Sequence, residues 1–132
     1  MILIDTSAWI EFLRDTGSST CDLVEELLPQ DIAICDAVSM EVLSGARDES
    51  HLRSLRELMA NAAMLTVYPI DYEEAAALYR HCRRRGETVR NLMDCLIAAV
   101  AIRNGAPVLY ADADFDVLAR HTKLSIYDAS ND

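Results

Sequence analysis

Short apolar runs alternate with longer amphipathic stretches along the chain. The first run, Ile2-Leu3-Ile4, has three branched apolar residues with no polar residue between them. This pattern is typical of a strand that is buried on both faces, as in a parallel sheet. Four later runs of similar character predict further strands at residues 32–35, 64–68, 107–110 and 124–127.

Between these runs, apolar residues recur three and four positions apart, which predicts helices. Thr6 or Ser7 is expected to cap the first helix, and Asp71 is expected to cap the fifth. Strands that alternate with helices predict a three-layer α/β domain around a mostly parallel, five-stranded sheet. The expected helices cover about residues 7–13, 20–28, 37–44, 49–59, 71–85, 91–104 and 115–119.

The stretch at 91–104 is apolar almost all round, so we expect its helix in the centre of the domain. Asp94 is the only acidic residue in it and lies one turn from its start. A lone buried carboxylate must be neutralised, paired with a cation or bound to a metal. A salt bridge to a nearby arginine is the structural explanation, and we favour a metal-binding or catalytic role over it.

Other acidic residues follow the ends of expected strands. Asp5 comes directly after the first strand, and Asp112 and Asp114 follow the fourth. Glu41 lies in the first turns of the helix after the second strand. In open α/β sheets, active sites form at the carboxyl ends of the strands, where the strand order reverses. We therefore expect the first and fourth strands to be neighbours and these acids to converge with Asp94, although a helix-capping role would explain Asp5 alone.

Converging carboxylates repel one another unless a cation lies between them. Sets of oxygen ligands suit Mg²⁺ or Mn²⁺ better than zinc. The sequence has no glycine-rich phosphate loop and no Gly-x-Ser-x-Gly motif. The simplest chemistry for such a site is therefore the hydrolysis of a phosphodiester bond by metal-activated water.

The chain has 132 residues, the size of one domain, and a net charge of −10. This charge disfavours nonspecific adhesion to nucleic acid, because phosphate contacts need cations. Arginines nevertheless gather at residues 80–90, where they suit phosphate contacts or form a solvated helix end. Apolar runs are too short to span a membrane, and the four dispersed cysteines favour reduced thiols in a cytoplasmic protein.

Four short segments occur together in the order and spacing of one known family. They resemble the PIN-domain ribonucleases, and specifically the toxin of a VapBC-type toxin–antitoxin pair. The resemblance covers essentially the whole chain, which implies a single PIN domain over residues 1–132. The segments are Ile4-Asp5-Thr6-Ser7-Ala8-Trp9, Glu41-Val42-Leu43-Ser44-Gly45, Asp94-Cys95-Leu96-Ile97-Ala98-Ala99 and Asp112-Ala113-Asp114-Phe115.

The resemblance implies a metal-dependent endoribonuclease with Mg²⁺ or Mn²⁺ as cofactor and a sheet of strand order 3-2-1-4-5. Thr6 and Ser7 would hold the acids in position without binding the metal themselves. Tyr110 stands where many relatives carry a smaller polar residue, so whether Asp112 or Asp114 contacts the metal directly stays open. The implied catalytic and metal-binding residues are Asp5, Glu41, Asp94 and Asp112, with Asp114 as a further ligand.

The same resemblance implies three partners. RNA would be the substrate, and Arg84, Arg85 and Arg90 would contact its phosphates. A cognate VapB-type antitoxin would inhibit the enzyme, and a second copy of the chain would form a homodimer through apolar helix faces.

Two other classes of protein fit part of the pattern. A phosphoacceptor signalling domain also gathers acids at strand ends, but it needs adjacent acids early and a lysine after a late strand. Here only Asp5 stands early, and Lys123 precedes the last expected strand. A PIN-like binding module without catalysis would be favoured by a missing acid, and all the acids are present.

Overall fold

A four-stranded parallel sheet forms the centre of the computed structural model, which describes residues 1–128. Its strands are β1 (Ile2–Ile4), β2 (Ile32–Cys35), β3 (Ala63–Leu65) and β4 (Val108–Leu109). The strand order is β3-β2-β1-β4, and Leu3 of β1 lies opposite Ala33 and Val108 of its two neighbours. The expected pairing of the first and fourth strands is therefore confirmed.

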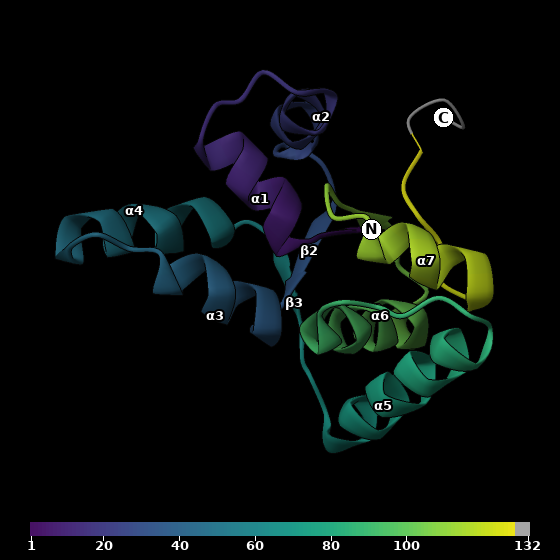
Figure 1. Cartoon of the computed structure of the whole chain (residues 1–132). Helices are drawn as coiled ribbons and strands as arrows, with labels where there is room; N and C mark the ends of the chain where they lie inside the picture. The colour runs from purple at the N-terminus through teal and green to yellow at the C-terminus, as the bar shows by residue number, and fades with distance from the viewer. Residues whose placement is uncertain (129–132) are drawn as a thin grey trace.

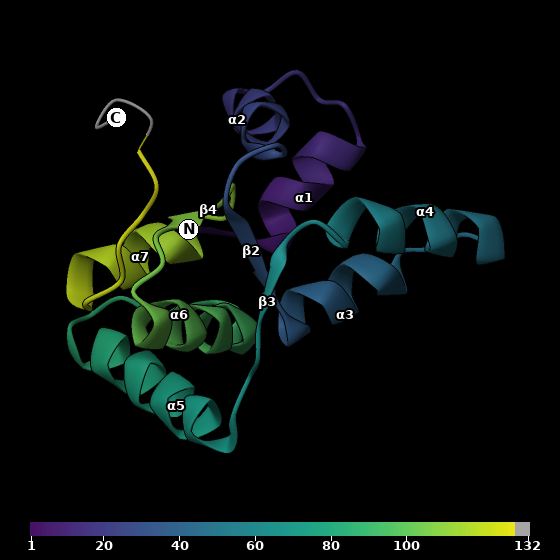
Figure 2. The same cartoon turned by 180° about the vertical axis from the view of Figure 1, so that it is seen from behind.

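Helices flank this sheet. Figure 1 shows α1 and α2 on one side of the strands and α5 and α6 on the other. The view from behind shows α3 and α4 extending together away from the sheet (Figure 2). The helices are α1 (Thr6–Leu13), α2 (Ser19–Leu27), α3 (Asp36–Ser44), α4 (Glu49–Met59), α5 (Pro69–Arg84), α6 (Leu92–Asn104) and α7 (Asp114–His121).

The prediction of five strands is wrong for the described residues. The segment expected as the fifth strand forms only an isolated parallel bridge between Ile126 and Val108. Two backbone hydrogen bonds join it to β4, from Val108 to Ser125 (3.0 Å) and from Tyr127 to Val108 (2.8 Å). Ser125 and Ile126 are exposed and Leu124 is buried, so the segment has little apolar surface to hold it in a longer ladder. The last four residues of the expected domain, 129–132, lie outside the described residues.

The third strand is also shorter than expected, because the chain leaves the sheet after Leu65. Arg103 donates a hydrogen bond to the carbonyl of Thr66 (2.8 Å) and holds this segment against α6. Helix α5 then begins at Pro69, where a missing N–H has no cost, so Asp71 lies inside the first turn and is not the cap. The carboxylate of Asp71 accepts the N–H of Tyr68 at 2.8 Å.

The core is centred on α6 and the strands. Residues 94–101 are all buried, which confirms the prediction of a central helix that is apolar all round. Trp9 of α1 and Phe115 of α7 have no exposed surface. Within residues 1–128, no helix is both long and apolar enough to cross a membrane.

Candidate metal centre

Asp5 follows the last residue of β1 and caps α1. Its Oδ2 accepts hydrogen bonds from the backbone N–H of Ser7 (3.0 Å) and from the Ser7 hydroxyl (2.5 Å). The Ser7 oxygen in turn accepts the N–H of Ala111, beyond the end of β4, at 2.9 Å. Asp5, and not Thr6 or Ser7, is therefore the cap, and Ser7 links the ends of two neighbouring strands.

The other carboxylate oxygen of Asp5 has a different environment. Asp5 is only 2% exposed, and its Oδ1 is buried without a hydrogen-bond partner among the described residues. Burial raises the pKa of Asp5 from 3.8 to about 6; the bonds from Ser7 oppose this rise, and the charge of Glu41 adds to it. Such an oxygen is one that a cation would satisfy.

Glu41 projects from α3 toward the start of α1. The hydroxyl of Thr6 donates a hydrogen bond of 2.7 Å to its Oε1. This bond joins two residues that are 35 positions apart and brings a third element to the carboxyl end of β1. Thr6 and Ser7 thus each hold one acid of the predicted site.

Asp94 lies in the first turn of α6 and is 5% exposed. Its Oδ2 is also buried without a partner in the described part of the chain. Burial, followed by the charges of Asp5 and Asp112, raises the pKa of Asp94 from 3.8 to about 9. Asp94 therefore lies close enough to Asp5 and to Asp112 for the charge of each to disfavour its ionisation.

Asp112 and Asp114 lie between β4 and α7, and their surroundings differ. Asp112 is partly exposed, and its Oδ1 accepts the N–H of Asp114 at 2.9 Å. Asp114 is buried and accepts the backbone N–H groups of Arg90 (3.0 Å) and Asn91 (2.9 Å), one on each oxygen. Burial opposes ionisation of Asp114, but these N–H groups, together with the side chains of Asp94 and Arg90, outweigh it and lower its pKa. Asp114 therefore fixes the loop that begins α6, and so helps to place Asp94.

Asp94, Asp112 and Asp114 each offer a carboxylate oxygen within 4.8 Å of the others, a spacing that could hold a metal ion. All the donors are carboxylate oxygens, which suits hard divalent cations. The orphaned oxygens of Asp5 and Asp94 fit the same use, because a buried carboxylate without a partner is costly. The residues present therefore fit a divalent cation.

The three arginines predicted to bind phosphates have separate environments. The Arg90 side chain pairs with Asp112 (Nη2–Oδ1, 3.5 Å) and with Asp114 (Nε–Oδ1, 3.4 Å). Arg84 and Arg85 lie at the exposed end of α5 and form no ion pair with these acids within residues 1–128. The pairing of Arg90 depends on the loop conformation, and no local signal in the sequence distinguishes it.

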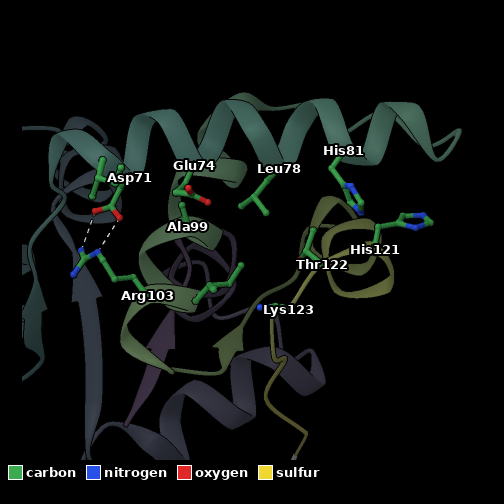
Figure 3. A pocket seen from close by; sticks show the side chains of 11 residues that line it. Asp71, Glu74, Leu78, His81, Ala99, Arg103, His121, Thr122 and Lys123 are labelled. Atoms are coloured by element: carbon green, nitrogen blue, oxygen red, sulfur yellow. Dashed lines mark hydrogen bonds and ion pairs between the residues drawn. The ribbon is translucent and has the colours of Figure 1, made fainter.

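A cavity of about 580 Å³ lies between α5, α6 and the residues after α7, and none of the five acids lines it. Figure 3 shows its walls, with the Asp71–Arg103 ion pair at one end and His81 and His121 at the other. The sequence pattern does not predict this cavity, because its walls come from segments that are far apart in the chain. Its position separates it from the acid cluster.

The comparison with protein families gives a match to the PIN domain over residues 2–121. The chain belongs to the PIN domain family. This result confirms the resemblance seen in the four sequence segments. Two of the predicted acids, Asp5 and Asp112, follow the neighbouring strands β1 and β4, whereas Glu41 lies on α3 and Asp94 on α6.

Several ribonucleases and one crystal structure match this chain over nearly its full length. VapC ribonuclease Mb1587 of Mycobacterium bovis is 51% identical over 128 residues, which are 94% of this chain and 96% of the relative. Ribonuclease VapC11 of Mycobacterium tuberculosis has the same 51% identity over 94% of this chain and 96% of its own. The crystal structure of VapBC-5, a member of the VapBC family of toxin–antitoxin systems from M. tuberculosis, superposes with a TM-score of 0.69 at 25% identity, over 97% of this chain and 98% of that one.

Proposed function

We propose that this chain is a metal-dependent endoribonuclease and the toxin component of a type II toxin–antitoxin pair. The observation that carries the proposal is the pair of buried, unpartnered carboxylate oxygens on Asp5 and Asp94. The identity of 51% to VapC ribonucleases supports RNA as the substrate. We also propose that the whole chain, residues 1–132, is one PIN domain.

The acids have distinct roles in this proposal. Asp5, Asp94 and Asp112 hold the cation, and Glu41 completes the set from α3. Asp114 is a weaker candidate for a ligand, because both of its oxygens already accept backbone N–H groups. Mg²⁺ or Mn²⁺, when bound, supplies the Lewis acidity that activates water and stabilises charge on the phosphate.

The residues around the acids orient them. Ser7 fixes the rotamer of Asp5 through the 2.5 Å bond and ties it to Ala111. Thr6 holds Glu41 in the same way. Hydrogen bonds of this kind set the direction of ligand oxygens before the cation arrives. Arg84, Arg85 and Arg90 are the proposed contacts to the phosphates of the RNA.

We further propose that a VapB-type antitoxin inhibits the enzyme. A groove of about 430 Å³ between α1, α3 and α4 contains Glu41 together with the exposed apolar residues Ile10 and Leu13. An apolar peptide segment would fill this groove, and a basic side chain on it would reach Glu41, the acid of a lining that also contains Arg14, Arg47 and His51. VapBC-5 is a member of a family of toxin–antitoxin systems, which supports a partner of this class.

A homodimer is proposed on a separate face. Exposed apolar side chains at the start of α5 and α6, among them Tyr68, Ile70, Tyr72 and Leu92, are each at least half exposed. Covering them would remove a substantial apolar area from water. Light scattering at micromolar concentrations should show a dimer, and a monomer throughout would contradict this part. A cytoplasmic location belongs to the same proposal, because the four cysteines are buried and free.

The test of the enzyme is a digest of total cellular RNA with Mg²⁺, Mn²⁺ or EDTA. Wild type should produce discrete fragments with either metal and none with EDTA. Asp5→Asn and Asp94→Asn should abolish cleavage, whereas Asp22→Asn, the same change at an exposed position of α2, should not. Intact cleavage by a folded Asp94→Asn protein would refute the site. Mn²⁺ binding without any cleavage would favour a non-catalytic PIN-like binding module.

A further inference from the structure

Arg90 is attached to the acid cluster at two points that differ in strength. Its backbone N–H donates a 3.0 Å bond to Asp114, and the N–H of Asn91 donates a 2.9 Å bond to the other oxygen. The guanidinium makes only longer contacts, 3.4 Å to Asp114 and 3.5 Å to Asp112. The side chain is 74% exposed. The backbone is therefore fixed at the rim of the site, and the guanidinium is held loosely.

This guanidinium is the one positive side chain in ion-pair contact with the five acids in the described part of the chain. Asp5, Glu41 and Asp94 form no ion pair with any residue in 1–128. Without the guanidinium, Asp114 would keep a hydrogen-bond partner on each oxygen, because backbone N–H groups bind both. The Arg90 guanidinium therefore supplies positive charge to the acid cluster, and the loop does not need it for support.

We propose that Arg90 is an internal counter-ion of the acid cluster, which a divalent cation displaces and which then binds a phosphate of the RNA substrate. The inference rests on the proposed function, since it assumes that the cluster binds a metal. A cation among the acids repels the guanidinium and weakens its attraction to Asp112. The guanidinium leaves at little cost, because its contacts are long and solvated.

The fixed backbone decides where the displaced guanidinium can go. Asp114 keeps the Arg90 N–H at the rim, so the side chain stays beside the acids after it turns outward. A phosphate drawn to the cation would lie within the same region. The planar fork of arginine matches two phosphate oxygens, which a lysine cannot do.

Mn²⁺ affinity provides the first test, and it needs no turnover. Isothermal titration calorimetry would compare wild type, Arg90→Ala, Arg90→Lys and the control Arg56→Ala, which removes an exposed arginine from α4. Arg90→Ala should bind Mn²⁺ about two- to five-fold more tightly than wild type, because a competing charge is gone. Arg90→Lys and Arg56→Ala should remain close to wild type.

The sign of the change separates this role from a structural one. If Arg90 only supported the loop, Arg90→Ala would bind Mn²⁺ more weakly and melt lower. Unchanged or weaker Mn²⁺ binding in Arg90→Ala would therefore overturn the counter-ion. Failure of wild type itself to bind Mn²⁺ would instead overturn the proposed function.

The second test concerns the phosphate. At saturating Mn²⁺, cleavage of the RNA that wild type attacks in the total-RNA digest should show a higher KM in Arg90→Ala and a smaller change in kcat. Arg90→Lys should restore KM only in part, since it keeps the charge and loses the fork. An unchanged KM in Arg90→Ala would overturn the transfer of the guanidinium to the substrate.

Discussion

The guanidinium of Arg103 binds the carboxylate of Asp71 through two N–H···O bonds, of 2.8 and 2.9 Å. Asp71 is 1% exposed, and Arg103 also stacks over the ring of Tyr68 at 4.8 Å. The pair joins the end of α6 to the start of α5. Asp94 lies in the first turn of α6 and Arg103 in its last turn. The ion pair therefore fixes the end of α6 that lies away from the acid cluster.

Removing this ion pair should lower stability in a pH-dependent way. Asp71→Asn should lower the free energy of unfolding at pH 7 by about 2–3 kcal/mol, because the variant cannot form charge-assisted bonds from a buried carboxylate. The bonds to Arg103 hold the pKa of Asp71 below its ordinary value of 3.8. The contribution of the pair is therefore complete above pH 3.8 and is lost as the pH falls toward the lowered pKa.

Urea unfolding at pH 7 and pH 3 measures this dependence. The difference between wild type and Asp71→Asn should be smaller at pH 3. The exposed variant Asp22→Asn serves as the control and should differ little from wild type at pH 7. A difference for Asp71→Asn that is equal at both pH values would contradict a role for the charge.

Metal binding should raise the melting temperature, and Asp94→Asn should change that response. A cation that binds only the folded state stabilises it by about 2.7 kcal/mol at 100 times Kd, or roughly 10 °C for a domain of this size. Because the pKa of Asp94 is raised to about 9, wild type must take up a proton there on folding at pH 7, which costs stability. The amide of Asp94→Asn avoids this cost, so the variant should melt higher than wild type in EDTA. It should gain less than wild type from Mn²⁺, because the amide is a poorer ligand. Should it melt lower in EDTA while wild type gains nothing from Mn²⁺, Asp94 would be a structural residue.

Ser7→Ala should weaken the metal site without touching a ligand. The change removes the hydroxyl that orients Asp5 and accepts the Ala111 N–H. Mn²⁺ affinity should fall about 10-fold or more, as is usual when a ligand is deprived of its supporting hydrogen bond. Ser18→Ala is the matched control, because it removes the cap of α2 and should cost only stability. Equal Mn²⁺ affinities in Ser7→Ala and wild type would show that Ser7 does not orient the ligand.

A double variant that combines Arg84→Ala and Arg85→Ala tests the proposed RNA contacts at the end of α5. If both arginines bind phosphates, the slope of log binding constant against log salt should flatten by about 0.7 for each phosphate that the variant no longer binds. The double variant of Arg53 and Arg56, exposed on α4, removes the same charge elsewhere. Fluorescence anisotropy with a labelled single-stranded RNA gives both slopes. Identical slopes for the two double variants would leave Arg84 and Arg85 as a solvated helix end.

The sequence alone determined those features that depend on local pattern. The run Ile2-Leu3-Ile4 predicts a buried strand whatever surrounds it, and the apolar stretch around Asp94 predicts a central helix. The order of strands and helices then limits the topology, since parallel strands need right-handed crossovers. From that topology alone, acids after the first and fourth strands are expected at one edge.

The use of each acid depends on contacts between segments that are far apart in the chain. Asp112 and Asp114 look equivalent in the sequence, but backbone N–H groups 23 and 24 positions away occupy the oxygens of Asp114. Arg90 resembles Arg84 and Arg85 until the loop before α6 turns its guanidinium to the acids. The segment at 124–127 also looks like a strand in the sequence, but it forms only an isolated bridge to Val108, because it has little apolar surface to pack against its neighbours. These outcomes are set by contacts between distant segments, and a local pattern contains no information about which N–H will reach which oxygen.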